Sequence, residues 1–215
     1  HADLLESPLA GKDDLKAAFE VTEGRARAFC VFDPRRPEAA QECERLLQSS
    51  VYAGIKLHPT MHATPADSPA YGPAFALAAA ASVPVMSHTW YRSPYNPPQE
   101  LSLPHRFRTH LERYPEVAFV MGHTGAGKDG LAEALELLRD IPNVYADLAG
   151  DVYEPGFIEA LVAAGGPERV LYASDAPWLD PAPQLACVLT ANLPEAALPL
   201  ILRDNAVRLF KLEET

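Results

Sequence analysis

The feature that most constrains the fold is a regular alternation of short apolar runs with helical patterns. The runs are three to five residues long, lie about 30 residues apart, and are rich in β-branched or aromatic side chains. Such runs are typical of buried strands. We predict six strands, at residues 28–32, 53–57, 83–86, 117–121, 144–146 and 170–173.

Helical patterns fill the intervals between these runs. The clearest has apolar residues at the i, i+3, i+4 and i+7 positions, namely Leu131, Ala134, Leu135 and Leu138. A second helical pattern has Ala39, Cys43 and Leu46 at the i, i+4 and i+7 positions. Because strands that alternate with helices are joined by helical crossovers, the strands are predicted to be parallel. Three prolines each end a helix just before the next strand: Pro115, Pro142 and Pro167.

Two α/β architectures fit this pattern, an open doubly wound sheet and a (β/α)₈ barrel. A complete barrel needs about 250 residues, whereas this chain has 215. The barrel interpretation therefore requires that the chain contain six of the eight units. We expect residues 1–215 to form a single domain, with the proline-rich residues 93–104 as a long loop inside one unit.

Charge and cysteine content exclude several classes of function. The chain has 29 acidic and 18 basic residues, a net charge of −11, and no basic cluster, so a nucleic-acid partner is not expected. No apolar run reaches the roughly 18 residues of a membrane span. Cys30, Cys43 and Cys187 form no CxxC pair, which argues against a disulfide framework and favours a reducing cytoplasm. Cys30 is expected to pack in the core.

Each predicted strand ends at an aspartate or a histidine, and Lys56 shares a face with His58 by strand alternation. Ligands of parallel α/β folds bind at the carboxyl ends of strands. Imidazole with carboxylate, without thiolate, suits a hydrolytic Zn²⁺, Mn²⁺ or Fe²⁺ site. The alternative is that these side chains cap helices or bond to nearby backbone. The residues are Asp33, His58, His88, His123, Asp147 and Asp175.

The strand sequences resemble those of the amidohydrolase-related (amidohydrolase family 2) metal-dependent hydrolases. The final helical segment, residues 205–210, resembles theirs too, so the resemblance extends over about residues 20 to 212. It implies a (β/α)₈ TIM barrel in which strands three to eight are represented here. The motifs that carry it are Gly54-Ile55-Lys56-Leu57-His58-Pro59, Pro84-Val85-Met86-Ser87-His88-Thr89-Trp90, Phe119-Val120-Met121-Gly122-His123-Thr124-Gly125, Tyr145-Ala146-Asp147 and Leu171-Tyr172-Ala173-Ser174-Asp175-Ala176-Pro177-Trp178.

The resemblance implies roles for three of these side chains. His88 would be a metal ligand, and His123 would position water or polarise the substrate. Asp175 would bind the metal and act as the general base. The expected cofactor is one divalent metal, zinc in the first place, with manganese or iron as alternatives.

Four further residues are expected to contact the substrate. Lys56 would bind a substrate carboxylate; the alternative is a carboxylated lysine that bridges two metals, as in binuclear members of the wider superfamily. His58, Trp90 and Arg92 would line the pocket from adjoining loops, and their other interpretation is packing between loops.

The implied function is metal-dependent hydrolysis, in which metal-activated water attacks an amide, ester or lactone carbonyl of a small carboxylated substrate. A decarboxylase or hydratase of the same family is the alternative, and a non-catalytic binding protein is a further one. We expect a homodimer. The family's first strand carries a His-x-His pair that this sequence lacks. We therefore expect roughly 50 to 70 residues, two barrel units, to be missing before His1.

One rival motif points to nucleotide binding. Residues 122–128 match G-x-x-x-x-G-K after a predicted strand and before a predicted helix. Asp129 stands where the motif needs Ser or Thr, and its carboxylate would repel phosphate. We expect Asp129 to be the N-cap of the following helix instead.

Overall fold

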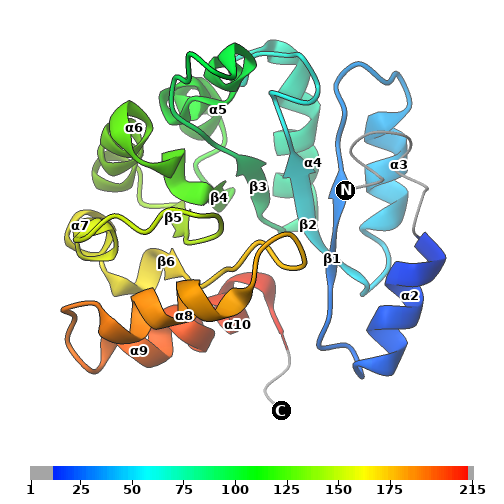
Figure 1. The fold of residues 1–215 in the computed structure, drawn as a ribbon. Helices are drawn as coiled ribbons and strands as arrows, with labels where there is room; N and C mark the ends of the chain where they lie inside the picture. Colours follow the sequence, from blue (N-terminus) through cyan, green and yellow to red (C-terminus); the bar gives the residue numbers. More distant parts are fainter. Residues whose placement is uncertain (1–11, 213–215) are drawn as a thin grey trace.

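The structure, a computed structural model, describes residues 12–212. Its centre is a sheet of six parallel strands whose order in space is their order in the chain. A doubly wound sheet reverses its strand order at a switch point. This sheet does not, and its strands curve about a common axis with the helices outside (Figure 1). The strands are β1(Ala28–Val31), β2(Tyr52–Leu57), β3(Val85–His88), β4(Phe119–Gly122), β5(Val144–Asp147) and β6(Val170–Leu171).

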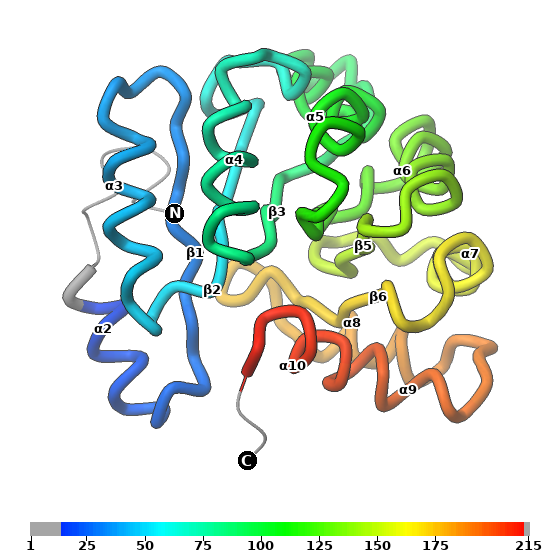
Figure 2. Tube along the Cα trace, turned by 180° about the vertical axis from the view of Figure 1, so that it is seen from behind, coloured from blue at the N-terminus to red at the C-terminus, as the bar shows by residue number. Residues whose placement is uncertain are grey.

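Helices follow the strands and cover the outer face of the sheet, as the view from behind shows (Figure 2). Short helical turns extend several of the connections, and one of them, η6, is a π-helix. The α-helices are α2(Lys12–Val21), α3(Ala39–Leu46), α4(Gly72–Ala81), α5(Arg108–Arg113), α6(Lys128–Asp140), α7(Phe157–Gly165), α8(Pro181–Thr190), α9(Ala197–Pro199) and α10(Asn205–Phe210). The short turns are η1(Pro69–Tyr71), η2(Pro97–Ser102), η3(Pro104–Phe107), η4(His123–Ala126), η5(Pro167–Arg169) and η6(Leu200–Asp204).

The six predicted strands and the two predicted helices are confirmed, with shifted ends. β6 keeps two of its four predicted residues, because the amide of Tyr172 donates to the carbonyl of Ile201 (2.8 Å) and the chain leaves the sheet there. The α3 positions Ala39, Cys43 and Leu46 are buried, as their spacing predicts. The loop predicted at 93–104 contains the η2 turn.

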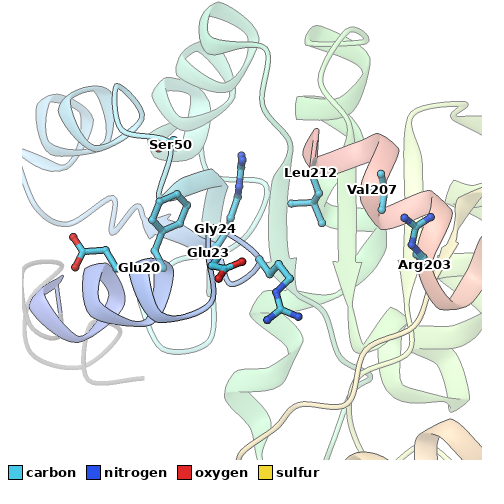
Figure 3. A pocket seen from close by; sticks show the side chains of 10 residues that line it. Glu20, Glu23, Gly24, Ser50, Arg203, Val207 and Leu212 are labelled. Carbon is cyan, nitrogen blue, oxygen red and sulfur yellow. The ribbon is translucent and has the colours of Figure 1, made fainter. Parts of the chain in front are cut away.

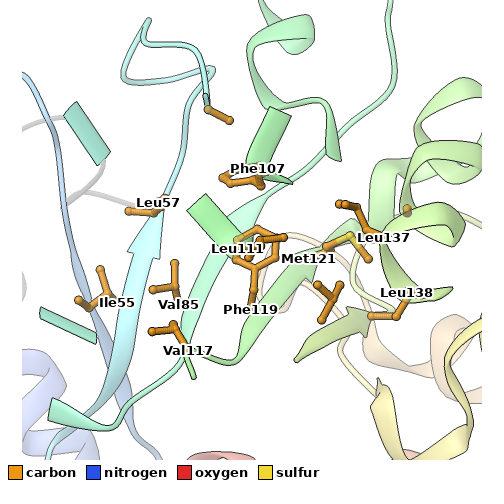
Figure 4. Packing of buried hydrophobic residues seen from close by; sticks show 14 of the residues in the cluster. Ile55, Leu57, Val85, Phe107, Leu111, Val117, Phe119, Met121, Leu137 and Leu138 are labelled. Atoms are coloured by element: carbon orange, nitrogen blue, oxygen red, sulfur yellow. The ribbon is translucent and has the colours of Figure 1, made fainter. Parts of the chain in front are cut away.

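The main core lies between the outer face of the sheet and the surrounding helices (Figure 4). Ile55 and Leu57 of β2, Val85 of β3 and Phe119 of β4 are fully buried on this face. Phe119 packs against Phe107 with ring centroids 4.6 Å apart. Since strand side chains alternate between faces, Lys56 and His88 point to the opposite face, inside the curve of the sheet.

β1 and β6 are not paired with each other among the described residues, so the sheet stays open between them. The C-terminal helix packs against the first strand, where the rings of Phe29 and Phe210 meet edge to face at 5.5 Å. A pocket of about 370 Å³ lies near the amino ends of β1 and β2 (Figure 3). Acidic, basic and apolar side chains line this pocket, and none of the predicted site residues is among them.

No helix in residues 12–212 is both long and apolar enough to cross a membrane.

Candidate active site

A pocket of about 450 Å³ opens at the carboxyl ends of the strands. Its wall combines side chains from the ends of β2, β3 and β4 with others from the loops after β3, β5 and β6. It brings together every residue to which the family resemblance assigns a role, except Arg92. The lining residues are Lys56, His58, His88, Trp90, Gln99, His123, Gly150, Asp151, Asp175, Trp178 and Leu179.

Three rings stack in parallel along one wall of this pocket. The imidazoles of His58 and His88 have centroids 4.2 Å apart and planes 11° apart. The indole of Trp90 continues the stack at 5.5 Å from His88, again at 11°. His123 meets both His88 (4.9 Å) and Trp90 (5.4 Å) edge to face. These rings therefore form an aromatic wall that carries imidazole nitrogens.

Burial keeps two of these imidazoles neutral. It lowers the pKa of His58 to about 3, helped by the neighbouring charges of Lys56, His62 and His123. Burial also lowers the pKa of His88 well below its ordinary value, with further lowering from His58 and His123. A neutral imidazole has a free lone pair, which is the form that binds a metal.

Lys56 and Asp147 are charged groups inside the curve of the sheet. Burial lowers the pKa of Lys56, and the carboxylates of Asp147 and Asp175 oppose this effect. Burial raises the pKa of Asp147, opposed mainly by His123. Asp147 is not among the residues that line the pocket; its Oδ1 accepts hydrogen bonds from the amides of Ala149 (2.7 Å) and His123 (3.4 Å). Asp147 thus holds the backbone that carries His123.

The backbone from His123 to Lys128 is an unusual left-handed turn. Four of its non-glycine residues have positive φ, between 44° and 63°. The left-handed conformation costs about 1–2 kcal/mol per such residue, so buried hydrogen bonds must stabilise it. Thr124 Oγ1 lies 2.7 Å from the carbonyl oxygen of Asp147 and 2.9 Å from its amide nitrogen, and the amide of Gly125 donates to Thr89 Oγ1 (2.9 Å). This turn directs the His123 ring into the pocket.

The same turn does not support the phosphate-loop alternative. The amide of Gly125 is already bonded to Thr89, and the ammonium of Lys128 lies 4.2 Å from the centroid of the Tyr91 ring. The prediction that Asp129 is a helix N-cap is wrong. α6 begins at Lys128 after Gly127, and Asp129 lies inside its first turn, where it pairs with Arg92.

Arg92, which we expected in the pocket, lies outside it. Its guanidinium is about half exposed and pairs with Asp129 (2.6 Å) and Glu133 (3.2 Å) of α6. The loop after β3 runs outward over α6, which carries Arg92 away from the strand ends. Asp33, at the end of β1, is also outside the pocket and pairs with Arg35 (2.6 Å).

The sequence did not indicate several of the lining residues. Gln99 lies eleven residues beyond His88 in a proline-rich loop without a recognisable motif. Asp151 and Leu179 also belong to loops. Trp178 is part of the motif at residues 171–178, but the resemblance assigns it no function in the site. A signal was available for Gly150, because a glycine shortly after a strand end often marks a close approach of the backbone.

The donor types of the pocket fit the implied divalent metal. His88 and His123 offer imidazole nitrogens, Asp175 offers carboxylate oxygens, and all three line one cavity in which His88 is neutral. Within residues 12–212, however, no three His, Cys, Asp or Glu side chains are arranged as a group that could hold a metal ion. The described residues therefore provide suitable ligands without a complete preformed set.

Comparison with solved structures gives the same fold at low sequence identity. A 2,6-dihydroxybenzoate decarboxylase from Rhizobium is 18% identical, with a TM-score of 0.74 over 93% of this chain and 75% of that one. A dihydroxybenzoic acid decarboxylase from Polaromonas sp. JS666, solved with manganese and 2-nitroresorcinol, is 19% identical, with a TM-score of 0.77 over 98% and 76%. A putative amidohydrolase from Staphylococcus aureus is 17% identical, with a TM-score of 0.72 over 93% and 78%.

A comparison with curated protein sequences gave no match. The family model described as "Amidohydrolase" matches residues 13–212, which is nearly all of the chain. The chain therefore belongs to the amidohydrolase family, and its parallel α/β sheet is six strands of that family's TIM-barrel fold.

Proposed function

We propose that this chain is a metal-dependent enzyme that decarboxylates a small planar aromatic acid. The observation that carries the proposal is the parallel stack of His58, His88 and Trp90, with the ammonium of Lys56 in the same pocket. Aromatic side chains pack favourably against a planar substrate ring, face to face or edge to face, while its carboxylate can pair with a lysine. Two of the structures similar to this chain are decarboxylases of dihydroxybenzoates, and one of them binds manganese.

The side chains have defined tasks in this reaction. Trp90 orients the substrate ring, and Lys56 attracts its carboxylate. His88 and Asp175 would hold the divalent metal, which when bound acts as a Lewis acid on substrate oxygens. As the bond to the carboxyl group breaks, its electron pair stays on the ring carbon. That carbon takes up a proton from solvent, which Asp175 would relay, and carbon dioxide leaves.

Hydrolysis, the reaction predicted from the sequence, is the second candidate. It is supported by the match to the amidohydrolase family model. In that reaction Asp175 would accept a proton from the attacking water. His123 would position that water through Nε2, which is free to accept a hydrogen bond because Nδ1 faces the carbonyl oxygen of Ala149 (3.1 Å).

Product analysis distinguishes the two reactions. The full chain is incubated with manganese and, separately, with dihydroxybenzoates and with aryl amides and lactones of similar size. Release of carbon dioxide with formation of the decarboxylated phenol supports the proposal. Cleavage of an amide or lactone without carbon dioxide supports hydrolysis, and turnover of neither class contradicts both.

Metal content tests the assigned residues. We expect His88→Ala and Asp175→Asn to bind less manganese than the unaltered chain, while His123→Asn keeps its metal and loses turnover. The control is His105→Ala, because His105 is exposed and pairs with Glu133 outside the pocket. Unchanged metal content in both the His88 and the Asp175 variants would contradict the assignment.

A further inference from the structure

The side chain of Gln99 reaches into the pocket from the loop after β3 and contacts His88. Its amide oxygen, Oε1, lies 2.8 Å from Nε2 of His88 and 3.0 Å from Oγ1 of Thr60. Gln99, for which the sequence predicted no role, therefore contacts both Thr60 in the loop after β2 and His88, a predicted metal ligand.

The amide oxygen of Gln99 lies at one end of a short chain of hydroxyl groups. Ser102 Oγ accepts a hydrogen bond from the amide of Thr60 (3.1 Å) and lies 2.7 Å from Thr60 Oγ1. Thr60 Oγ1 donates its proton to Gln99 Oε1, so the hydroxyl of Ser102 donates to Thr60. Each hydroxyl proton then has one acceptor, and the same oxygen of Gln99 lies 2.8 Å from Nε2 of His88.

Backbone hydrogen bonds hold the segment that carries this network. The amide of Ala66 donates to the carbonyl of Leu101 (2.9 Å), and the amide of Trp90 donates to the carbonyl of Ser102 (3.2 Å). Ser102 is fully buried. The segment that carries Gln99 is therefore held between the loop after β2 and the end of β3.

This contact determines which nitrogen of His88 carries a proton. An amide oxygen is an acceptor and cannot donate, so the hydrogen bond requires a proton on Nε2. His88 is 7% exposed and stacked between His58 and Trp90, where an uncharged ring is favoured. A neutral imidazole has one ring proton, and with that proton on Nε2 the lone pair is on Nδ1.

We propose that Gln99 is a positioning residue that fixes His88 in the Nε2–H tautomer and so makes Nδ1 the atom available to a divalent metal. Ligating histidines commonly donate their other ring N–H to a neighbouring acceptor, which orients the ring and strengthens the ligand. The metal-binding half of this inference rests on the proposed function, whereas the tautomer does not.

Nitrogen NMR of the histidine rings in the metal-free full chain tests the tautomer. We expect His88 of the unaltered chain to carry its proton on Nε2. In Gln99→Leu the acceptor is gone, and His88 should become a mixture of both tautomers. Gln99→Glu restores an acceptor oxygen and should restore the Nε2–H form. Asn96→Leu is the control, since Asn96 is exposed on the same loop and does not line the pocket.

Manganese titration of the same four proteins tests the metal-binding half. We expect Gln99→Leu to bind manganese about 10–100-fold more weakly than the unaltered chain. The manganese affinities of Gln99→Glu and Asn96→Leu should stay near that of the unaltered chain. An Nδ1–H tautomer in the unaltered chain, or a tautomer that Gln99→Leu leaves unchanged, overturns the inference. The expected tautomers without any manganese binding would support the role of Gln99 and contradict the proposed function.

Discussion

A β-carbon at position 150 would lie 2.9 Å from Nδ1 of His123, closer than side-chain carbons approach other groups in folded proteins. Gly150 has a φ of +102°, and the preceding carbonyl, that of Ala149, lies 3.1 Å from the same His123 nitrogen. The backbone of residues 149 and 150 is therefore the surface on which the His123 ring rests.

Replacing Gly150 with alanine should displace His123. We expect Gly150→Ala to lower turnover by roughly 100-fold, the scale of a misplacement of about 1 Å at a reacting group. Gly156→Ala is the matched control, because Gly156 also has positive φ (+81°) but a β-carbon there meets nothing within 4 Å. Both variants lose some stability from the backbone conformation. Equal turnover of the two would show that His123 does not depend on Gly150.

Removal of the Arg92 side chain should leave substrate binding intact. Since its guanidinium pairs with Asp129 and Glu133 in solvent, Arg92→Ala should cost less than about 1 kcal/mol of stability. The control is Arg108→Ala, which breaks another exposed ion pair, to Asp140 (2.7 Å). Denaturant unfolding and KM are measured for both. A KM that rises in Arg92→Ala alone would place Arg92 at the substrate, as its sequence position suggested.

Acidification should destabilise the fold through His62. This ring is fully buried against Tyr71 (2.9 Å), and burial lowers its pKa to about 4 from 6.5. Between these values the unfolded chain binds a proton that the folded chain does not. Stability is therefore lost as the pH falls from about 6.5 to 4, by up to about 3 kcal/mol from this group.

The comparison protein for this effect is His62→Gln. Below pH 6.5 the stability of this variant should fall less steeply with falling pH than that of the unaltered chain. The reason is that the variant takes up about one proton fewer when it unfolds. Above pH 7.5 the difference between the two proteins should be constant, since His62 is neutral there in both states. Parallel curves across the whole range would show that His62 titrates normally in the folded chain.

Truncation of Phe119 should produce the largest loss of stability outside the pocket. Its ring is fully buried between Phe107 (4.6 Å) and Phe75 (6.2 Å). Phe119→Ala should cost about 3–5 kcal/mol in denaturant unfolding. The control Tyr95→Ala removes a ring that is 97% exposed and should stay within about 0.5 kcal/mol. Similar losses in both would contradict the assigned core.

Features that repeat in every unit could be predicted from the sequence. Strand alternation placed Lys56 on the same face as His58, and the strand ends located His88 and His123 in one pocket, because parallel strands end at one edge of the sheet. Residues beyond the strand ends depend on loop paths that no periodic pattern specifies. Gln99 and Arg92 share one loop, yet contacts with Thr60 bring the first into the pocket and contacts with α6 take the second out.

The order of the strands has a consequence for how ligands and folding are linked. Each strand pairs with the strands that precede and follow it in the sequence. Every contact between strands therefore joins segments that are only about one βα unit apart in the chain. The pocket is less local, since its residues extend from Lys56, on β2, to Leu179, beyond β6. A chain that has lost β6 keeps most of its sheet but no longer presents Asp175. A ligand of this pocket therefore stabilises the connection of the last unit to the four before it, and its binding reports whether the units from β2 to β6 have assembled.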